Sequence, residues 1–183
     1  MLFLRRFLRD EQLESAAATL YGGFAGQARQ PIFYISFDVP DSVDGRFEMV
    51  ALHAYLVFRR LKGQGAEIDR LTQATYDVMF KQMDLALHEL GAADLGVGRR
   101  IKHMTESLNG RIQVYDEPLV GADDAALGDA LRRNLYGTVE VSDAALAAMV
   151  AYTRAAATQL TGQNTAALAA GEITFPTPDE FIR

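Results

Sequence analysis

The chain has 183 residues, of which 49% are hydrophobic and 23% charged, a balance that suits one globular domain and excludes wholesale disorder. It contains no cysteine, which excludes a disulfide scaffold, a thiolate metal site and a cysteine nucleophile, and which fits a reducing compartment. The net charge of -6 argues against a general nucleic-acid-binding protein, because phosphate binding needs a concentrated basic face.

Residues 1–9 have the pattern of a short basic amphipathic helix. On a helix, its apolar and basic side chains fall on opposite faces: Phe3, Leu4, Phe7 and Leu8 against Arg5, Arg6 and Arg9. Such a helix binds at an anionic membrane surface, and the alternative is that its apolar face packs on the protein's own domain. A secretory signal needs a longer apolar stretch and a small-residue cleavage site, and a membrane-spanning helix needs roughly 20 apolar residues, so neither is expected.

The next part of the chain is predicted to be helical over residues 10–29, 43–62 and 67–90. Gln30-Pro31 breaks the first helix, and Pro31 can equally start a short new helix through Ile35. After a loop over 37–42, either Asp41 or Ser42 caps the helix over 43–62. That helix is apolar on nearly all sides and is therefore expected to be central. Gly63-Gln64-Gly65 ends it, and the following helix is expected to return antiparallel to it.

The remaining helices are predicted after Gly91, starting at Asp94, and then around Leu127–Leu135 and Leu146–Leu160. An acidic loop over 117–124 separates the first of these from the next. We therefore predict an all-α protein with a single bundle of about seven helices over 10–161 and a central antiparallel helix hairpin. Residues 162–183 are interpreted as a C-terminal tail in which Pro176 and Pro178 exclude regular structure.

No motif in the sequence predicts catalysis, a metal ion or a cofactor. The glycine-rich segment over 91–100 has some features of a phosphate cradle, but no strand precedes it and no lysine-serine pair follows it. The histidines, His53, His88 and His103, do not form an i, i+4 zinc motif, and no Gly-x-Ser-x-Gly elbow occurs. A carboxylate-based enzyme using Asp77, Asp84 and His88 remains as a rival interpretation.

A polar stripe on each of the two central helices stands out from this apolar background. Arg46, His53 and Arg60 are seven residues apart on the helix over 43–62, and Asp77 and Asp84 are seven apart on the next helix, with His88 alongside. In an antiparallel hairpin Arg46 comes level with Asp84, His53 with Asp77, and Arg60 with the neighbourhood of Asp69. We interpret this as a polar seam that fixes the helix register. The alternative is that part of this stripe of six residues stays exposed and binds a partner.

Several blocks of residues, in order, resemble the ubiquinol–cytochrome c chaperone family. They are Phe33-Tyr34, the run from Val39 to Phe47 with Leu52-His53, Arg59-Arg60-Leu61, Asp77-Val78-Met79-Phe80 with Met83-Asp84, Glu89-Leu90-Gly91, Asp94 to Gly98, Lys102-x-Met104, and Arg132 to Tyr136. The resemblance covers about residues 15 to 160.

This resemblance implies an all-helical assembly chaperone for ubiquinol–cytochrome c reductase, without catalytic activity. It implies newly made cytochrome b as the client, with a small partner protein and the ribosome as further partners. A cytoplasmic protein at the inner face of the inner membrane is expected, where the basic helix over 1–9 contacts the membrane surface. A membrane-surface or lipid-binding helical module is the alternative.

Overall fold

The computed structural model describes residues 2–89, 106, 110, 113–137 and 139–182, without the side chains of residues 2–9, Leu87 and Glu89. In chain order its helices are α1 (Leu2–Ala28), α2 (Pro31–Ile35), α3 (Val43–Leu61), α4 (Ala66–Glu89), α6 (Asp124–Leu131), the π-helical turn η1 (Arg132–Tyr136), α7 (Asp143–Gly162), α8 (Thr165–Ala169) and the 3-10 helix η2 (Pro178–Phe181). Residues 113–120 are also helical. The described part of the chain contains no strand, which confirms the predicted all-α fold, and none of its helices has the length and apolar character needed to cross a membrane.

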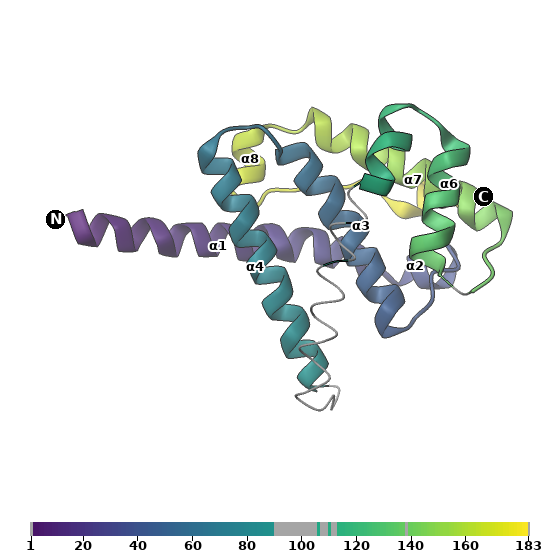
Figure 1. Cartoon of the computed structure of the whole chain (residues 1–183), viewed down its shortest axis with the longest axis horizontal. Coiled ribbons are helices and arrows are strands. Elements are labelled where there is room, and N and C mark those ends of the chain that lie inside the picture. Colours follow the sequence, from purple (N-terminus) through teal and green to yellow (C-terminus); the bar gives the residue numbers. More distant parts are fainter. Residues whose placement is uncertain (1, 90–105, 107–109, 111–112, 138, 183) are drawn as a thin grey trace.

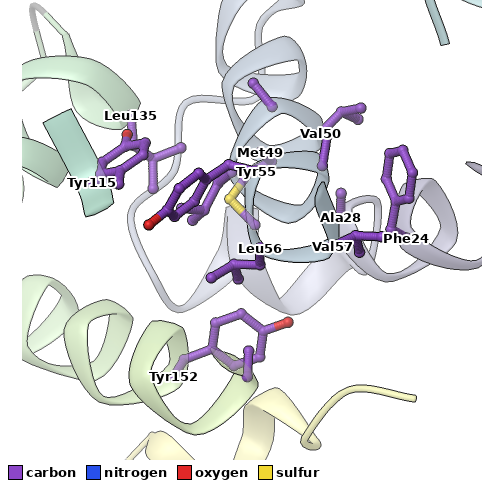
Figure 2. Packing of buried hydrophobic residues seen from close by; sticks show 14 of the residues in the cluster. Phe24, Ala28, Met49, Val50, Tyr55, Leu56, Val57, Tyr115, Leu135 and Tyr152 are labelled. Atoms are coloured by element: carbon purple, nitrogen blue, oxygen red, sulfur yellow. The ribbon is translucent and has the colours of Figure 1, made fainter. Parts of the chain in front are cut away.

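α3 lies at the centre of the molecule, as its sequence predicts. Every residue from Met49 to Phe58 is buried, so the middle of this helix is covered on all sides. Figure 2 shows the packing around it, with side chains from α1, α7, η1 and the helix over 113–120 turned toward α3. The core therefore forms around one helix rather than between two layers.

α1 is one uninterrupted helix, so the division that the sequence suggested after residue 9 is not present in the backbone. Its later turns bury Ala17, Leu20 and Phe24 against α3 and α4. In Figure 1 its N-terminal end extends beyond α4 and away from the rest of the bundle.

α3 and α4 run in opposite directions from the turn between them, as predicted (Figure 1). Gly63 and Gly65 have φ values of 74° and 108°, which favour glycine. α4, however, packs more extensively against α1 than against α3. α3 and α4 are therefore connected as an antiparallel hairpin. They do not, however, form the long mutual interface that a polar seam would require.

Residues 162–183 were expected to form a tail without regular structure, and the structure differs. This segment contains α8 and η2, and Pro178 occupies the first turn of η2, where a missing N–H costs nothing. The ring of Phe175 packs 5.2 Å from that of His53, and Phe181 packs 5.8 Å from Tyr152. Gly171, at φ 85°, lies so close to α1 that a Cβ there would be 2.5 Å from Thr19 Cγ2. Apolar contacts therefore hold the C-terminal segment across α1 and α7.

Side-chain caps mark the starts of several helices. Of the two predicted candidates for the cap of α3, the structure selects Ser42, whose hydroxyl accepts a hydrogen bond from the Gly45 amide at 3.1 Å.

The glycine-rich segment over 91–100 and the helix predicted from Asp94 lie outside the described residues.

Candidate functional site

The loop between α2 and α3 is fastened to the start of α7. Asp38 has φ 55°, an unusual value for a residue other than glycine, and its carboxylate accepts hydrogen bonds from the backbone N–H of Ser142 at 3.1 Å and from its hydroxyl at 2.7 Å. Both hydrogen bonds lower the pKa of Asp38, and the one from the Ser142 hydroxyl has the larger effect. The Ser142 hydroxyl also accepts the Ala145 amide and so caps α7. Ser142 thus holds the α2–α3 loop in place and also caps the first turn of α7.

A hollow of about 580 Å³ lies between this loop and the segment before α7. We call it the α2–α3 hollow, and it is lined by Tyr34, Asp38, Val39, Pro40, Val139, Glu140, Val141 and Ser142. Val139, one of the lining residues, is 42% exposed, and Ile35, which is not part of the lining but follows Tyr34 in the chain, is 77% exposed. Exposed apolar side chains near a hollow with polar edges are compatible with a surface that binds another protein.

A charged pair and an aromatic ring stand beside the hollow. Arg46 Nε donates to Asp41 Oδ1 at 2.6 Å, and the guanidinium carbon lies 5.7 Å from the centre of the Tyr34 ring. The hydrogen bond to Arg46 lowers the pKa of Asp41, whereas burial raises the pKa of Tyr34. The Arg46 and Asp41 side chains remain 61% and 57% exposed. Both are therefore accessible to a partner.

Gly45 explains how the loop approaches α3 so closely. A Cβ at this position would lie 2.0 Å from the carbonyl oxygen of Pro40. Only glycine therefore lets the Val39-Pro40-Asp41 segment fold back over the first turn of α3. This accounts physically for a glycine within the run from Val39 to Phe47.

The predicted polar seam between α3 and α4 is wrong. Arg46, His53 and Arg60 do share one face of α3, but His53 and Arg60 contact α7 and the segment after it. Arg60 donates to the carbonyl oxygens of Leu160 at 2.9 Å and Gln163 at 2.7 Å, and so satisfies acceptors left over at the C-terminal end of α7. The three residues do share one face of α3, but His53 and Arg60 contact α7 and the segment after it, and Arg46 pairs with Asp41 in the α2–α3 loop.

His53 is fully buried and therefore is not on the surface of this structure. Its Nδ1 donates to the Met49 carbonyl at 2.8 Å, because a carbonyl can only accept, and its Nε2 accepts from the Tyr152 hydroxyl at 2.7 Å. Gln27 Nε2 in turn donates to the Tyr152 oxygen at 3.0 Å. Burial lowers the pKa of His53 to about 4, so the imidazole is neutral near pH 7. The network joins α1, α3 and α7.

The other predicted partner-binding residues, Asp77, Asp84 and His88, follow one another along α4. Gln73 donates to Asp77 at 2.9 Å, and His88 Nδ1 lies 3.7 Å from an Asp84 carboxylate oxygen and 2.8 Å from its backbone oxygen. Among the described residues, no group of three histidine or carboxylate side chains has an arrangement that would hold a metal ion. The structure does not bring these three residues to the α2–α3 hollow.

The membrane-surface residues predicted over 3–9 lie on the first turns of α1, and their side chains are outside the described set. The residues that sequence reasoning missed are Asp38, Val139 and Ser142. Asp38 precedes a proline by two positions and Ser142 precedes a helix, which are local signals of a turn and a cap. No local signal could show that residues 104 positions apart hydrogen-bond to each other.

Comparison with known proteins gives three findings. Residues 36–175 match the sequence model of a family described as ubiquinol-cytochrome C chaperone. The chain is 24% identical over 154 residues to ubiquinol-cytochrome c reductase complex assembly factor 1 of Drosophila melanogaster, a match that covers 81% of this chain and 59% of that protein. It is also 33% identical to the crystal structure of the Cbp3 homolog from Brucella abortus, with a TM-score of 0.85 over 98% of this chain and 99% of that one.

Proposed function

Because the chain belongs to the ubiquinol–cytochrome c chaperone family, we propose that it is an assembly chaperone for ubiquinol–cytochrome c reductase and that it binds newly made cytochrome b. Its match to the reductase assembly factor of Drosophila melanogaster supports this activity, although the chain spans only 59% of the length of that relative. The chaperone works at the inner face of the inner membrane and catalyses no reaction of its own.

The observation that carries the proposal is the exposed apolar surface at the α2–α3 hollow. Ile35 has 77% of its surface exposed although it follows two residues that anchor α2, the buried Phe33 and the half-buried Tyr34. Burying an isoleucine side chain contributes about 1.5–3 kcal/mol, so a client that covers Ile35 and Val139 gains a useful part of its binding energy there. The accessible Arg46–Asp41 pair supplies the polar edge that orients a client.

A capture experiment in the native cells tests both the client and the surface. The variant Val139→Asp places a charge in the lining of the hollow, and Ile35→Asp places one directly after the lining residue Tyr34. The matched control Val120→Asp places a charge at another exposed valine, 67% exposed, on the helix over 113–120. We expect the two hollow variants to recover much less cytochrome b than the control, with unchanged melting temperatures. Equal recovery by all three would reject the hollow as the client surface. If the unsubstituted protein recovers no cytochrome b although the captured proteins are identified with good coverage, the proposed client is rejected.

The further partners that the family resemblance implies are tested by the same capture. We propose that a small partner protein and ribosomal proteins of the exit site accompany the client. Their recovery with the unsubstituted protein, and its loss when translation is stopped before lysis, would support co-translational binding. Cytochrome b recovered without any ribosomal protein would restrict the chaperone to completed client chains.

Peripheral membrane contact is a second candidate function, and the projection of α1 beyond α4 favours it (Figure 1). A helix end that extends away from the bundle can lie flat on a bilayer without disturbing the core. We expect the full chain to float with vesicles containing anionic lipid and a chain starting at Asp10 to remain in the unbound fraction. Equal flotation of both would reject residues 2–9 as the contact.

The rival interpretation, a carboxylate-based enzyme at Asp77, Asp84 and His88, makes a different prediction. It requires a bound metal ion at near one equivalent in the purified protein. Elemental analysis of protein prepared without chelators would show this, and a clearly substoichiometric value would reject the metal-dependent form of the rival.

A further inference from the structure

The segment over residues 171–182, which we call the strap, runs antiparallel to α7. Near its start, Thr174 pairs with Gln163 just after the end of α7, and near its end the Phe181 ring packs 5.8 Å from Tyr152 in the middle of α7. In Figure 1 the strap is the yellow segment that follows α8. Apart from the short helix η2 it has no regular structure. The strap is therefore an extended segment laid on the helices of the bundle.

Side-chain amides of the bundle hold the backbone of the strap. Among the described residues, no backbone–backbone hydrogen bond joins residues 173–182 to another element. Instead, the Gln163 amide donates to the Thr174 carbonyl at 2.7 Å and accepts from the Thr174 N–H at 3.0 Å. Gln27 of α1 donates to the Pro176 carbonyl at 3.3 Å. A segment held by so few hydrogen bonds opens at a lower free energy than the helices beneath it, so the strap can leave while the bundle stays folded.

The surface under the strap receives alternate side chains. Ile173 lies so close to α1 that a Cβ on Gly23 would collide with it, and the Phe175 ring packs 5.2 Å from the His53 ring of α3. Thr174, between them, is exposed, because successive side chains of an extended segment point to opposite sides. Bound extended peptides show the same combination of hydrogen bonds to the backbone and pockets for alternate side chains. We call this surface the strap groove, and its residues are Gly23, Gln27, His53, Tyr152 and Gln163.

We propose that the strap is a built-in ligand of the strap groove and that an extended segment of the client displaces it. The segment that fits has an aliphatic residue, one intervening residue and an aromatic residue followed by proline, the order of Ile173, Phe175 and Pro176. The inference rests on the proposed function, because a newly made client has backbone groups not yet paired that the two glutamine amides can bind. The strap groove shares no residue with the lining of the α2–α3 hollow. The strap thus covers a second, aromatic surface, which would attract other proteins if it were left open.

A reversible lock tests whether the strap has to leave. The chain has no cysteine, and a Cβ on Gly23 would lie 3.8 Å from the Cβ of Ile173, which is the usual Cβ–Cβ separation in a disulfide. In the full-length double variant Gly23→Cys/Ile173→Cys, oxidation therefore fastens the strap to α1, and dithiothreitol releases it in the same molecule. The single variant Ile173→Cys, treated in the same two ways, is the control.

The probe is a labelled peptide with the sequence of residues 171–182, and the control peptide has alanine in place of both phenylalanines. We expect the strap peptide to bind the reduced double variant and not the oxidised one, and the control peptide to bind neither. The attached strap competes at an effective concentration on the order of mM. Phe175→Ala weakens the strap and leaves the groove intact, so it should raise the affinity for the peptide about 10-fold or more. Thr177→Ala, at an exposed position of the strap, is the matched control and should leave the affinity at the wild-type value.

Three results would overturn the proposal. Equal binding of the peptide to the oxidised and reduced forms would place its site elsewhere on the molecule. Absence of binding to every form, Phe175→Ala included, would show that the strap is a fixed part of the fold. A dimer in solution that the oxidised lock abolishes would show that the strap exchanges between two copies of this chain.

Overlapping short peptides that cover the sequence of cytochrome b test the client. Binding of cytochrome b peptides with the aliphatic–x–aromatic–proline pattern to the reduced double variant, and not to the oxidised one, supports the proposal. If the strap peptide binds and no cytochrome b peptide does, the strap groove does not receive the client and the proposal is rejected. The chaperone function is then still decided by the capture of cytochrome b with the unsubstituted protein, so the two failures are distinguishable.

Discussion

His53 makes the stability of this protein depend on pH between 7 and 5. The imidazole has no exposed surface, and its two nitrogens already have partners, the Met49 carbonyl and the Tyr152 hydroxyl. If Nε2 gains a proton, it can no longer accept from Tyr152, and a positive charge is buried among Phe33, Phe175 and Tyr152. The unfolded chain meets no such penalty. It therefore binds the proton more tightly than the folded protein.

The size of the effect follows from the two pKa values. The pKa of His53 is about 4 in the folded protein and 6.5 as an ordinary histidine. Because the folded pKa is depressed, the unfolded state holds more protons between these values, and stability is lost as the pH falls from about 6.5 toward 4. Each pKa unit corresponds to about 1.4 kcal/mol, so lowering the pH from 7 to 5 costs about 2 kcal/mol of unfolding free energy.

Urea denaturation at pH 7, 6 and 5, followed by circular dichroism, measures this loss. The reference is His53→Gln, whose amide retains a donor and an acceptor but does not titrate, and the control is His88→Gln on the exposed side of α4. The wild type should lose about 2 kcal/mol more than His53→Gln over this range, and His88→Gln, which keeps the buried His53, should still show that loss. Parallel profiles of the wild type and His53→Gln would refute the reasoning. An imidazole nitrogen NMR signal of His53 that titrates near pH 6.5 would refute it independently.

Two further substitutions test the contacts that assemble the site. Arg60→Met removes the hydrogen bonds that satisfy the end of α7, and it should lower the unfolding free energy by about 2–3 kcal/mol, against little change for the exposed Arg133→Met, both measured by urea denaturation. Gly45→Ala places a Cβ 2.0 Å from the Pro40 oxygen and should destabilise the protein by about 2–3 kcal/mol. Gly26→Ala, in the open on α1, should instead stabilise it by up to about 1 kcal/mol. Equal melting temperatures for the two glycine variants would contradict the close approach of the loop.

Local sequence patterns predicted the helices well, because the signals that begin, continue and end a helix come from residues close together in the chain. The apolar run that identifies α3 as central, the proline that begins α2 and the glycine turn after α3 all act within a few positions of one another. The capping serine at 42 is likewise readable, because a cap hydrogen-bonds within three residues of itself. The family resemblance is of the same kind, since it depends on ordered blocks of sequence.

Which surfaces meet was decided by tertiary packing. The spacing of Arg46, His53 and Arg60 correctly placed them on one face of α3, but charge matching along the chain favoured α4 as the partner, whereas burial of the aromatic cluster around Tyr152 turns that face toward α7. The C-terminal segment is a second example. Its prolines indicated a tail, yet Phe175 and Phe181 pack against the aromatic rings of His53 on α3 and Tyr152 on α7, which no local pattern predicts. The sequence by itself determined the all-α class, the position of α3 at the centre and the family. Only the tertiary structure decided the α2–α3 hollow, because the hollow brings together residues far apart in the chain through packing energy that depends on all of them at once.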